Sequence, residues 1–559
     1  MLKSRSRSAS LTGNGLLTLI LLMTVMMPLA LGAAANASGN QKMAMTSIPY
    51  STMDGQQPTN TTPMAIWTYK TPPNIYPGGT TPVVANLSGN GKEDVLIWMS
   101  NSSAAADPNN QWNQSILCCL NGTTGNMIWN YTVLGGTPPT VADLFGNGKD
   151  EVLVSSFGYD CFNHPVPASV TCLNGTTGTR LWNYTTTWDD AFSSSPVVAD
   201  LYGNGKNEVL ATSFNTTYCF NGTTGDIIWS SATGCCYSSP VVADLLGNGK
   251  KEVLVAAFYT TLYCLNGTTG NILWSSTTGY NDNSPTVADL LENGKLEVLV
   301  GSRNGGVYCF NGTGAELWSF TAGSDITASP VTADLFGNGK LDVLVGSLDD
   351  SVYCLNGTNG NELWNYNTGG FIQSAPVADD LFGNGKLEVL VGSQDGNVYC
   401  FNGTTGNKLW NSTTGAVYTS PLVVDTSGDG TLVMVGADSV VAGLYCLNGA
   451  TGNILWIYTT GGTLGSPPAV ADLFGNGQEE ILVGAIIYST ESAPGTSLAP
   501  SSSEGGALYC LAIPESNTQT NQPTASNNAL LIEIGIIGIG GFTIAAIAFV
   551  KVEKPKKGR

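Results

Sequence analysis

The stretch Asp380–Val424 reads DLFGNGKLEVLVGSQDGNVYCFNGTTGNKLWNSTTGAVYTSPLVV, and close copies of it follow one another along most of the chain. Each copy opens with an Asp or Asn just before a glycine-rich turn. Nine copies begin in this way, at Asn86, Asp143, Asp200, Asp244, Asp289, Asp334, Asp380, Asp425 and Asp472. Most starts lie roughly 45 residues apart, a period that indicates a repeated supersecondary unit.

Each copy predicts four short strands. Segments such as SPVVAD (Ser195–Asp200) are almost wholly apolar, as expected of a strand buried on both faces. The following segment, KLEVLVGS in the copy above, is rich in β-branched residues, and NVYCFNG and NKLWNST come after tight turns. Because no helical periodicity is present, the unit predicts the blade of an all-β propeller and excludes a helical solenoid.

The two ends of the repeat region complement each other. The last copy reaches Cys510 but lacks the strand that carries a tryptophan, and an orphan segment AIWTYKT with Trp67 precedes the first copy. If the Trp67 strand completes the last blade, the ring closes and leaves no open sheet edge. We therefore expect a closed propeller of nine four-stranded blades; an eight-bladed ring with one irregular unit is the alternative.

Composition limits the function classes. The chain has 559 residues, of which 41 are Asp or Glu and 21 are Lys or Arg, and its net charge is −20. Such a field repels a phosphate backbone, so we expect no nucleic-acid partner. The single histidine, His164, argues against a site built on several imidazoles.

Both ends of the chain carry membrane signals. Residues 1–36 have the order of a secretory signal peptide, basic then apolar then small, with an uncleaved anchor as the alternative. A disordered lead-in (37–65), the propeller (66–513) and a polar stalk (514–528) follow. An apolar stretch over residues 529–550 predicts one transmembrane helix, and its basic flank (551–559) places the C-terminus in the cytoplasm. The propeller is thus expected outside the cell membrane.

The segment CFNGTTGNKLW (Cys400–Trp410) resembles the tryptophan-docking motif of the pyrroloquinoline-quinone (PQQ) dehydrogenase propellers, Ala-x-Asp-x-x-Thr-Gly-x-x-x-Trp. Cys400 stands at the alanine, Asn402 at the aspartate and Trp410 at the tryptophan. In that family the tryptophan packs between neighbouring blades, so the resemblance implies the same structural role here. The corresponding residues are Trp67, Trp129, Trp182, Trp229, Trp274, Trp318, Trp364, Trp410 and Trp456.

The cysteine before each docking turn replaces a small apolar residue. Equivalent cysteines on adjacent blades are expected to lie farther apart than the ~7 Å that a disulfide can bridge between Cα atoms. Nine of the thirteen cysteines are therefore predicted to be free, buried thiols. The repeated Cys/Trp pair is interpreted as scaffold.

The other half of the unit, such as VADLFGNGKLEVLVG, resembles the FG-GAP (integrin-type) repeat with its calcium loop. Several copies place a phenylalanine at the third ligand position, as at Phe145, Phe336 and Phe382, and an aromatic ring cannot bind a cation that requires oxygen ligands. Two copies keep more oxygen atoms. Calcium is a candidate cofactor at Asn86, Ser88, Asn90 and Asp94, and at Asp425, Ser427 and Asp429; elsewhere the Asp and Asn-Gly residues serve a tight turn.

Function is expected where the copies differ. The connection between second and third strands is longer in units nine, one and two, and the exits of units two (TTTWDDAFSSSP) and three (TGCCYSSP) are unusual. In a propeller these connections emerge on one face, so they gather in one sector. The ligand-binding candidates there are Trp112, His164, Trp188, Asp189, Asp190, Cys235, Cys236 and Tyr237; exposed aromatic residues beside carboxylates are typical of binding surfaces.

The adjacent pair Cys235–Cys236 resembles the vicinal disulfide of quinoprotein alcohol dehydrogenases, but the other catalytic residues of that family are not recognisable. The sequence therefore favours a non-catalytic cell-surface module that binds an extracellular protein or glycan, or serves as an adhesion or assembly scaffold. The alternative is a membrane-tethered PQQ-dependent oxidoreductase. Sequons outside the docking turns, among them Asn130, Asn183 and Asn411, are glycosylation candidates.

Overall fold

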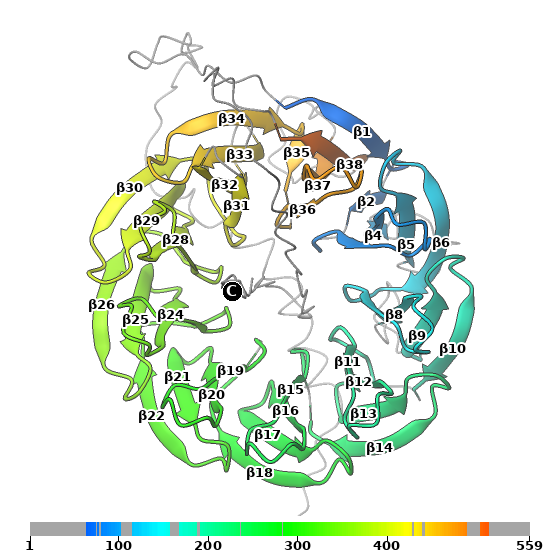
Figure 1. Ribbon diagram of the computed structural model, residues 1–559, viewed down its shortest axis with the longest axis horizontal. Coiled ribbons are helices and arrows are strands. Elements are labelled where there is room, and N and C mark those ends of the chain that lie inside the picture. The colour runs from blue at the N-terminus through cyan, green and yellow to red at the C-terminus, as the bar shows by residue number, and fades with distance from the viewer. Residues whose placement is uncertain are drawn as a thin grey trace, which may run out of the picture. The chain divides into compact units, whose positions relative to one another are not determined.

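A computed structural model describes residues 63–513, except for 74, 78–79, 102–113, 157–166, 187–189, 235, 282, 427–429, 439–441, 465 and 489–502. Within these residues the chain forms nine antiparallel sheets and no helix. The sheets follow one another around a ring, as Figure 1 shows. The prediction of a nine-bladed all-β propeller is confirmed, and the eight-bladed alternative is wrong.

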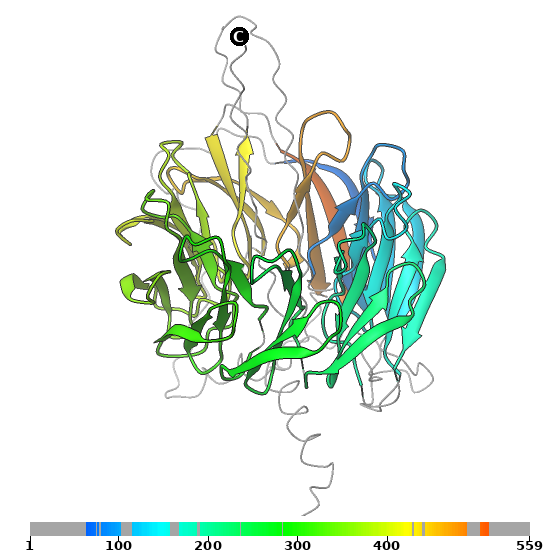
Figure 2. The same cartoon turned by 60° about the horizontal axis from the view of Figure 1, so that its bottom comes forward.

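Each blade places its first strand nearest the centre of the ring and its fourth at the rim (Figures 1 and 2). The strands of blades 1 to 4 are β3 (Val83–Ala85), β4 (Asp94–Asn101), β5 (Gln114–Asn121) and β6 (Met127–Leu134); β7 (Thr140–Ala142), β8 (Glu151–Ser155), β9 (Ser169–Asn174) and β10 (Arg180–Thr185); β11 (Val197–Ala199), β12 (Glu208–Thr212), β13 (Thr216–Asn221) and β14 (Ile227–Ala232); and β15 (Val241–Ala243), β16 (Glu252–Ala257), β17 (Thr261–Asn266) and β18 (Ile272–Thr277).

Blades 5 to 8 repeat this order with little variation in length. Their strands are β19 (Thr286–Ala288), β20 (Glu297–Gly301), β21 (Gly306–Phe310) and β22 (Glu316–Thr321); β23 (Val331–Ala333), β24 (Asp342–Gly346), β25 (Ser351–Asn356) and β26 (Glu362–Asn367); β27 (Val377–Asp379), β28 (Glu388–Gly392), β29 (Asn397–Asn402) and β30 (Lys408–Thr413); and β31 (Leu422–Thr426), β32 (Gly430–Ala437), β33 (Gly443–Asn448) and β34 (Ile454–Thr459).

Blade 9 is made from both ends of the described chain. It contains β36 (Ala469–Ala471), β37 (Glu480–Tyr488) and β38 (Ser503–Ala512), and its rim strand is β1 (Ala65–Lys70). Trp67 pairs with Cys510 across β1 and β38, in the register that the other blades use within one continuous repeat. The ring therefore closes through the orphan strand, as predicted, and the last blade has no open edge.

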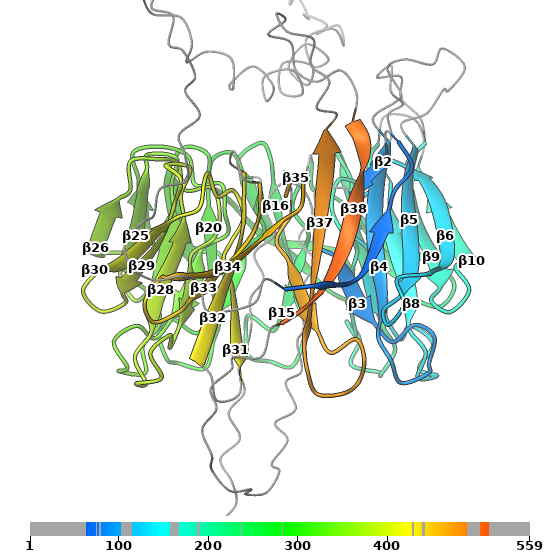
Figure 3. The ribbon, with the colours of Figure 1, turned by 90° about the horizontal axis from the view of Figure 1, so that it is seen from above.

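The closure seam has two additional short strands. β2 (Ile75–Pro77) pairs with β4 of blade 1, and β35 (Gly462–Thr463) pairs with β37 of blade 9. The Thr71 backbone N–H donates to the carbonyl of Gly506 at 3.0 Å, which ties the chain after β1 to β38. Figure 3 shows β2, β37 and β38 extending towards the upper edge of the ring.

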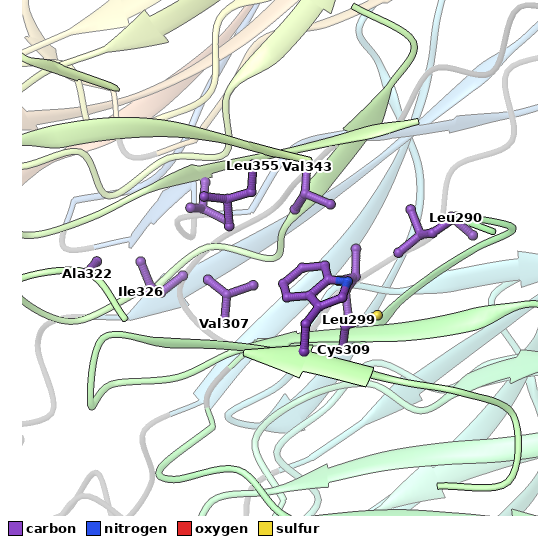
Figure 4. Close-up of a cluster of buried hydrophobic side chains, with 11 residues drawn as sticks. Leu290, Leu299, Val307, Cys309, Ala322, Ile326, Val343 and Leu355 are labelled. Carbon is purple, nitrogen blue, oxygen red and sulfur yellow. The ribbon is translucent and has the colours of Figure 1, made fainter. Parts of the chain in front are cut away.

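The core lies between blades. The second and third strands are buried almost throughout, and each hydrophobic cluster combines residues of two successive blades. In the cluster of Figure 4, Leu299, Val307 and Cys309 of blade 5 pack against Val343 and Leu355 of blade 6. Stability therefore depends on contacts between neighbouring repeats, as in other repeat architectures.

The innermost strands differ from expectation. Their three residues are half-buried in most blades, for example Val197, Val198 and Ala199 of β11, whereas burial on both faces was predicted. The reason is tertiary: this strand has a single neighbour in its sheet, the second strand of the same blade, and its other edge lies towards the centre of the ring (Figure 1). An apolar run is compatible with either environment.

The membrane signals predicted from the sequence lie outside the described residues. This applies to the signal peptide, the stalk, the stretch 529–550 and the basic tail, which remain predictions. Among the residues that the structure describes, none belongs to a helix long and apolar enough to cross a membrane.

Candidate functional site

The two edges of the ring have different chemistry. Because the strands of a blade are antiparallel, the connections between strands one and two and between strands three and four lie at one edge, here called the turn edge. The connections between strands two and three and the linkers between blades lie at the opposite edge, here called the loop edge. The loop edge is the upper edge in Figure 3, where β2 lies.

The docking tryptophans link each blade to the next near the turn edge. The indole Nε1 of Trp364 donates to the carbonyl of Gly403 in the next blade at 2.8 Å, and seven other blades repeat this bond at 2.7 to 3.0 Å. The ring of Trp364 also lies against Gly406, whose φ is +68°. The cysteine beside each tryptophan is buried. This repeated pair thus builds the scaffold and presents no reactive group to solvent.

The docking tryptophan of blade 8 meets the seam instead. Trp456 is buried in a cluster with Val483 and Leu511 of blade 9, where the chain ends replace the usual turn. The nine docking-motif cysteines are all free and buried, namely Cys119, Cys172, Cys219, Cys264, Cys309, Cys354, Cys400, Cys446 and Cys510. Burial raises the pKa of the Cys172, Cys264 and Cys309 thiols to about 12.

Most of the glycine-rich loops at the turn edge satisfy their own polar groups. In blade 2 the Asp143 carboxylate accepts the backbone N–H groups of Asn147 and Gly148 at 3.1 and 2.7 Å, and these hydrogen bonds lower its pKa. The same two bonds recur at the first Asp of six other blades, namely Asp200, Asp244, Asp289, Asp334, Asp380 and Asp472. These aspartates are committed to the turn, as the sequence predicted for most copies.

The blade 1 loop is different. Asp94 is fully buried and accepts the backbone N–H and hydroxyl of Ser88 through Oδ2 alone, at 2.8 and 2.6 Å. Asp94 Oδ1 and Asn86 Oδ1 are buried and accept no hydrogen bond, while Asn90 accepts from the N–H of Lys92. Two unused oxygen acceptors are donor atoms of the kind that calcium takes, so the residues present fit a cation better here than in any other described loop.

The second calcium candidate is only partly described. Asp425 is exposed at the end of β31, whereas Ser427 and Asp429 lie outside the described residues. Among the residues that are described, no three Asp, Glu, His or Cys side chains are grouped so as to hold a metal ion.

A buried carboxylate recurs in eight of the nine blades, and the sequence interpretation singled out only one of them, Asp94. It stands at the start of the second strand, and its exposure is at most 4% in eight blades, at Asp94, Glu151, Glu208, Glu252, Glu297, Asp342, Glu388 and Glu480. Glu480 accepts the backbone N–H of Leu473 at 2.9 Å. Burial raises the pKa of Glu480 to about 7 and that of Asp342 to about 6. The sequence signal for this feature was the acidic residue that recurs at the start of the second strand in successive copies.

Five of the eight predicted ligand-binding residues lie outside the described part of the chain: Trp112, His164, Trp188, Asp189 and Cys235. Their connections leave the described strands at the loop edge, between β4 and β5, between β8 and β9, and in two blade linkers. The remaining three, Asp190, Cys236 and Tyr237, have defined surroundings in blades 2 to 4.

Asp190 holds its own loop in place. Its carboxylate accepts the hydroxyl of Tyr218 at 3.1 Å and the backbone N–H of Asn215 at 3.2 Å. Its backbone carbonyl accepts the hydroxyl of Thr186 at 2.7 Å. Burial and the nearby Asp190 charge raise the pKa of Tyr218. The position therefore joins the linker to blade 3, and its carboxylate is already engaged.

Cys236 is fully buried between blades 3 and 4, in a cluster with Leu210 and Val255. Its carbonyl accepts the hydroxyl of Ser193, so it also joins two successive linkers. The equivalent linker positions, five residues before the first strand of the following blade, hold apolar side chains such as Ile372 and Val417, both fully buried. Cys236 is thus placed as a core residue.

Tyr237 belongs to a group of aromatic side chains, here called the aromatic platform, which comprises Phe214, Tyr237, Phe258, Tyr259 and Tyr280. Tyr237 contacts Phe214 at 5.7 Å between ring centroids and Phe258 at 5.1 Å. Phe258 in turn contacts Tyr259 at 5.2 Å and Tyr280 at 5.6 Å. The rings come from the loop edge of blades 3 and 4 and from the linkers 3–4 and 4–5.

Sequence reasoning found only one member of this platform. Phe214, Phe258, Tyr259 and Tyr280 lie in connections of ordinary length, and the search for function was directed at unusually long ones. The available signal was the presence of aromatic residues in the loop-edge connections of consecutive copies, which the ring brings side by side.

Charge is distributed unevenly between the edges. Of the described lysines and arginines, only Lys70 and Arg303 lie at the loop edge. Burial raises the pKa of Asp325, and the charge of the nearby Arg303 offsets part of this rise. The other lysines and arginines lie in the glycine-rich turns or at the starts of rim strands, for example Lys386 and Lys408. The loop edge carries Asp190, Asp325, Asp349, Asp350, Asp395 and Asp438. The described side chains of the loop edge therefore carry a net negative charge.

A protein-family model for PQQ-type repeats, described as "Outer membrane protein assembly factor BamB", matches residues 166–302, 303–413 and 394–474. These matches together span more than half of the chain. The chain belongs to this family. The resemblance stated from the docking motif is thereby confirmed, and the ring is a PQQ-type β-propeller.

Solved structures similar to this PQQ-type propeller include BamB from Moraxella catarrhalis, with 14% identity, a TM-score of 0.43 and coverage of 67% of this chain and 97% of that one. A europium-containing methanol dehydrogenase has 12% identity and a TM-score of 0.48, and the match covers 81% of this chain and 93% of that one. The V. cholerae biofilm matrix protein Bap1 has 16% identity and a TM-score of 0.46, and the match covers 80% of this chain and 90% of that one. A search of curated proteins found no significant relative. The family assignment rests on the sequence match.

Proposed function

We propose that this PQQ-type propeller is a non-catalytic binding scaffold of the cell surface, and that it binds another envelope component through its loop edge. The observation that carries the proposal is the aromatic platform. Its two outermost rings, Tyr259 and Tyr280, are 46% and 49% exposed although each contacts Phe258. Aromatic side chains gathered on loops above a rigid sheet framework are typical of recognition surfaces.

Two further features support binding over catalysis. The repeated cysteines are buried thiols whose pKa is raised, which disfavours the reactive thiolate. The loop edge carries few cationic groups, which disfavours an anionic quinone cofactor there. The family description as an assembly factor also favours a scaffold. Placement at the cell surface, with a single membrane anchor and the C-terminus in the cytoplasm, follows from the sequence signals.

The test uses the full-length protein in detergent, incubated with the envelope fraction of the cells that produce it, followed by chemical cross-linking. We expect the wild type to retain one or a few discrete components that a Tyr237→Ala, Tyr280→Ala double variant loses. The matched control is Phe371→Ala, Tyr418→Ala, which alters exposed aromatic residues on linkers 6–7 and 7–8 of the same edge. Equal capture by all three proteins would refute the loop edge of blades 3 and 4 as the binding surface.

The oxidoreductase alternative is tested with the same preparation. PQQ and calcium are added, and reduction of an electron-accepting dye is followed with a panel of alcohols and aldehydes. We expect no turnover above that of free PQQ. Substrate-dependent dye reduction that requires the protein would overturn the non-catalytic proposal.

A further inference from the structure

We infer that the aromatic platform is a stacking site for a neutral saccharide. This inference rests on the proposed function, because it names the ligand class of the same loop edge. It draws on three observations: the geometry of the rings, the way their loops are held, and the size and charge of the surface they present.

The rings form a continuous series with Phe258 at its centre. The interplanar angles are 62° for Phe214 and Tyr237, 80° for Tyr237 and Phe258, and 75° for Phe258 and Tyr259. Phe258 is only 6% exposed, so it supports the others from below. Edge-to-face packing fixes the outer rings and leaves flat aromatic surface towards solvent. A pyranose ring presents a flat face of C–H groups that such a surface can cover.

Backbone hydrogen bonds between blades hold the loops. The carbonyl of Tyr280 accepts the N–H of Arg303 at 2.8 Å and the hydroxyl of Ser302 at 2.9 Å. The Asn281 side-chain amide donates to the carbonyl of Ala257 at 3.2 Å, directly before Phe258. The platform is therefore preorganised, which lowers the entropic cost of binding.

One backbone conformation in the platform is strained. Thr260 has a φ of +86°, which is rare for a β-branched residue. Its carbonyl accepts the N–H of Thr278 at 3.0 Å, so the linker that carries Tyr280 fastens this turn. The same turn position has a positive φ in the next three blades, at Gly305 (+81°), Asp350 (+71°) and Gly396 (+97°), so this conformation belongs to the repeat and fixes the turn that carries Tyr259.

The size of the platform favours a small ligand. Half-exposed aromatic side chains leave on the order of 100 Å² each, so the whole platform presents a few hundred Å². A standard protein–protein interface needs about 800 Å² on each partner. One or two sugar rings match the smaller area, whereas a folded protein partner would require much additional surface from other loops.

The charge of the surrounding edge favours a neutral sugar. Arg303 is the one described cation at the loop edge of blades 3 to 5, and it faces Asp325. Acidic polysaccharides and nucleic acids are therefore disfavoured as ligands, because both are negatively charged. The polar side chains of the linker that carries Tyr280, namely Thr278, Asn281, Asn283 and Ser284, are buried and hold the linker in place, so the aromatic rings are the surface that meets the ligand.

Equivalent positions elsewhere in the ring provide the control. Phe371 stands five residues before the linker proline, as Tyr280 does, and Tyr418 stands three residues before it, as Tyr237 does. Phe371 and Tyr418 are 47% and 40% exposed. Among the aromatic pairs of the described residues, neither side chain contacts another aromatic ring. They match the platform in exposure and position, and they lack its clustering.

The experiment measures binding of the full-length protein in detergent to immobilised neutral oligosaccharides of glucose, mannose, galactose and N-acetylglucosamine, followed by calorimetry with the best ligand. We expect binding that changes less than twofold between 50 and 500 mM NaCl. Affinity should fall at least tenfold in Tyr259→Ala, Tyr280→Ala and less than twofold in Phe371→Ala, Tyr418→Ala. Tyr280→Leu, which keeps apolar bulk against Phe258, should also weaken binding and guards against loss of folding.

Three results would overturn the inference. They are the absence of neutral-sugar binding at millimolar concentration, equal losses in the platform and control variants, and a strong salt dependence that indicates an anionic ligand. If sugar binding is absent but the Tyr237→Ala, Tyr280→Ala variant still loses an envelope component in the cross-linking test, the ligand chemistry is wrong and the proposed function stands. If both tests fail, the loop edge of blades 3 and 4 has no binding role.

Discussion

At the scale of single residues, this propeller depends on a few positions repeated in every blade. A docking turn needs glycine for two separate reasons, which Gly406 illustrates: its φ is +68°, and a Cβ atom there would lie 2.7 Å from the ring of Trp364. The asparagine at the start of the turn also recurs, and Asn402 Oδ1 accepts the N–H of Thr405 at 2.9 Å. These positions explain why the motif repeats so faithfully.

Gly406→Ala should therefore destabilise the ring more than the same replacement at a glycine that has a positive φ but no close neighbour. The left-handed conformation costs an L-residue about 1–2 kcal/mol, and the contact with the indole adds overpacking of about 1–3 kcal/mol. Gly383→Ala is the matched control, because its φ is +65° and a Cβ there meets nothing within 4 Å. Thermal melting of both variants measures the difference; equal losses would show that the tryptophan contact imposes no requirement for glycine.

The thiols allow a second test at this scale. Because burial raises the pKa of the docking cysteines, to about 12 for Cys172 and Cys510, these thiols are not thiolates at pH 8 and should react slowly in the folded protein. After denaturation without reductant, we expect a reactive-thiol count of at least nine. Rapid labelling of the folded protein, or a much smaller count after denaturation, would contradict the assignment of these cysteines as free core residues.

At the scale of elements, the seam is the part of the ring that the repeat alone does not build. β1 supplies Trp67 to the cluster between blades 9 and 1, and its Nε1 donates to Gly122 at 2.7 Å. Thr71 then ties the chain to Gly506. Closure consequently depends on a strand that is separated from its partner by almost the whole chain.

Deletion of Ile66–Thr71 should open blade 9. It removes a buried tryptophan, whose loss typically costs about 3–5 kcal/mol, and exposes the edge of β38 to pairing with other chains. We expect a lower melting temperature and concentration-dependent association in sedimentation. Deletion of six residues from the predicted stalk, Ser516–Asn521, is the control. If the two deletions melted alike and stayed monomeric, the seam would contribute little to ring stability.

The blade 1 loop predicts a calcium effect. The unused oxygen atoms of Asn86 and Asp94 should bind calcium at millimolar concentration, and a fivefold excess over Kd would stabilise the ring by about 1 kcal/mol. Asn86→Ala should abolish the calcium-dependent rise in melting temperature with little effect in its absence, because Asn86 Oδ1 accepts no hydrogen bond. A rise that persists in this variant would place the calcium elsewhere.

At the scale of the whole molecule, the ring combines an acidic loop edge with a series of buried carboxylates. Burial raises the pKa of Glu480 and of Asp342 above the ordinary values of these groups. The folded protein therefore holds protons that the unfolded chain releases. This contribution to stability is complete below the ordinary pKa of about 4.3 for glutamate and is lost as the pH rises through about 7.

The ring should thus melt at a higher temperature at pH 5 than at pH 8. Glu480→Gln keeps an acceptor for Leu473 and removes the titration, so it should reduce the difference between the two pH values. Glu362→Gln, which replaces an exposed glutamate on β26, is the control. A melting temperature that rises from pH 5 to pH 8 in the wild type would contradict the inferred pKa shifts.

The sequence by itself determined the fold and its closure. The period of the copies, their strand patterns and the orphan Trp67 strand together predicted nine blades, with eight as the alternative, because each feature is local or is a matter of counting. The sequence also predicted the position of the docking residues, because the glycine of the turn fixes the local backbone conformation and the tryptophan after it fixes the contact with the next blade. The sequence showed that the carboxylate recurs, but it did not show that this carboxylate is buried or that the inner strands are half-exposed, because burial depends on how the blades are placed in the ring.

Only the tertiary structure decided the composition of the candidate site. Phe214, Tyr237 and Tyr280 lie in three different connections, and the ring brings them together by stacking consecutive blades. The structure likewise showed that Asp190 is engaged by Tyr218 and that Cys236 belongs to the core. A sequence ranks loops by their length and residue types. The contacts between loops depend on distances across blades, and those are fixed only when the repeat closes into a ring.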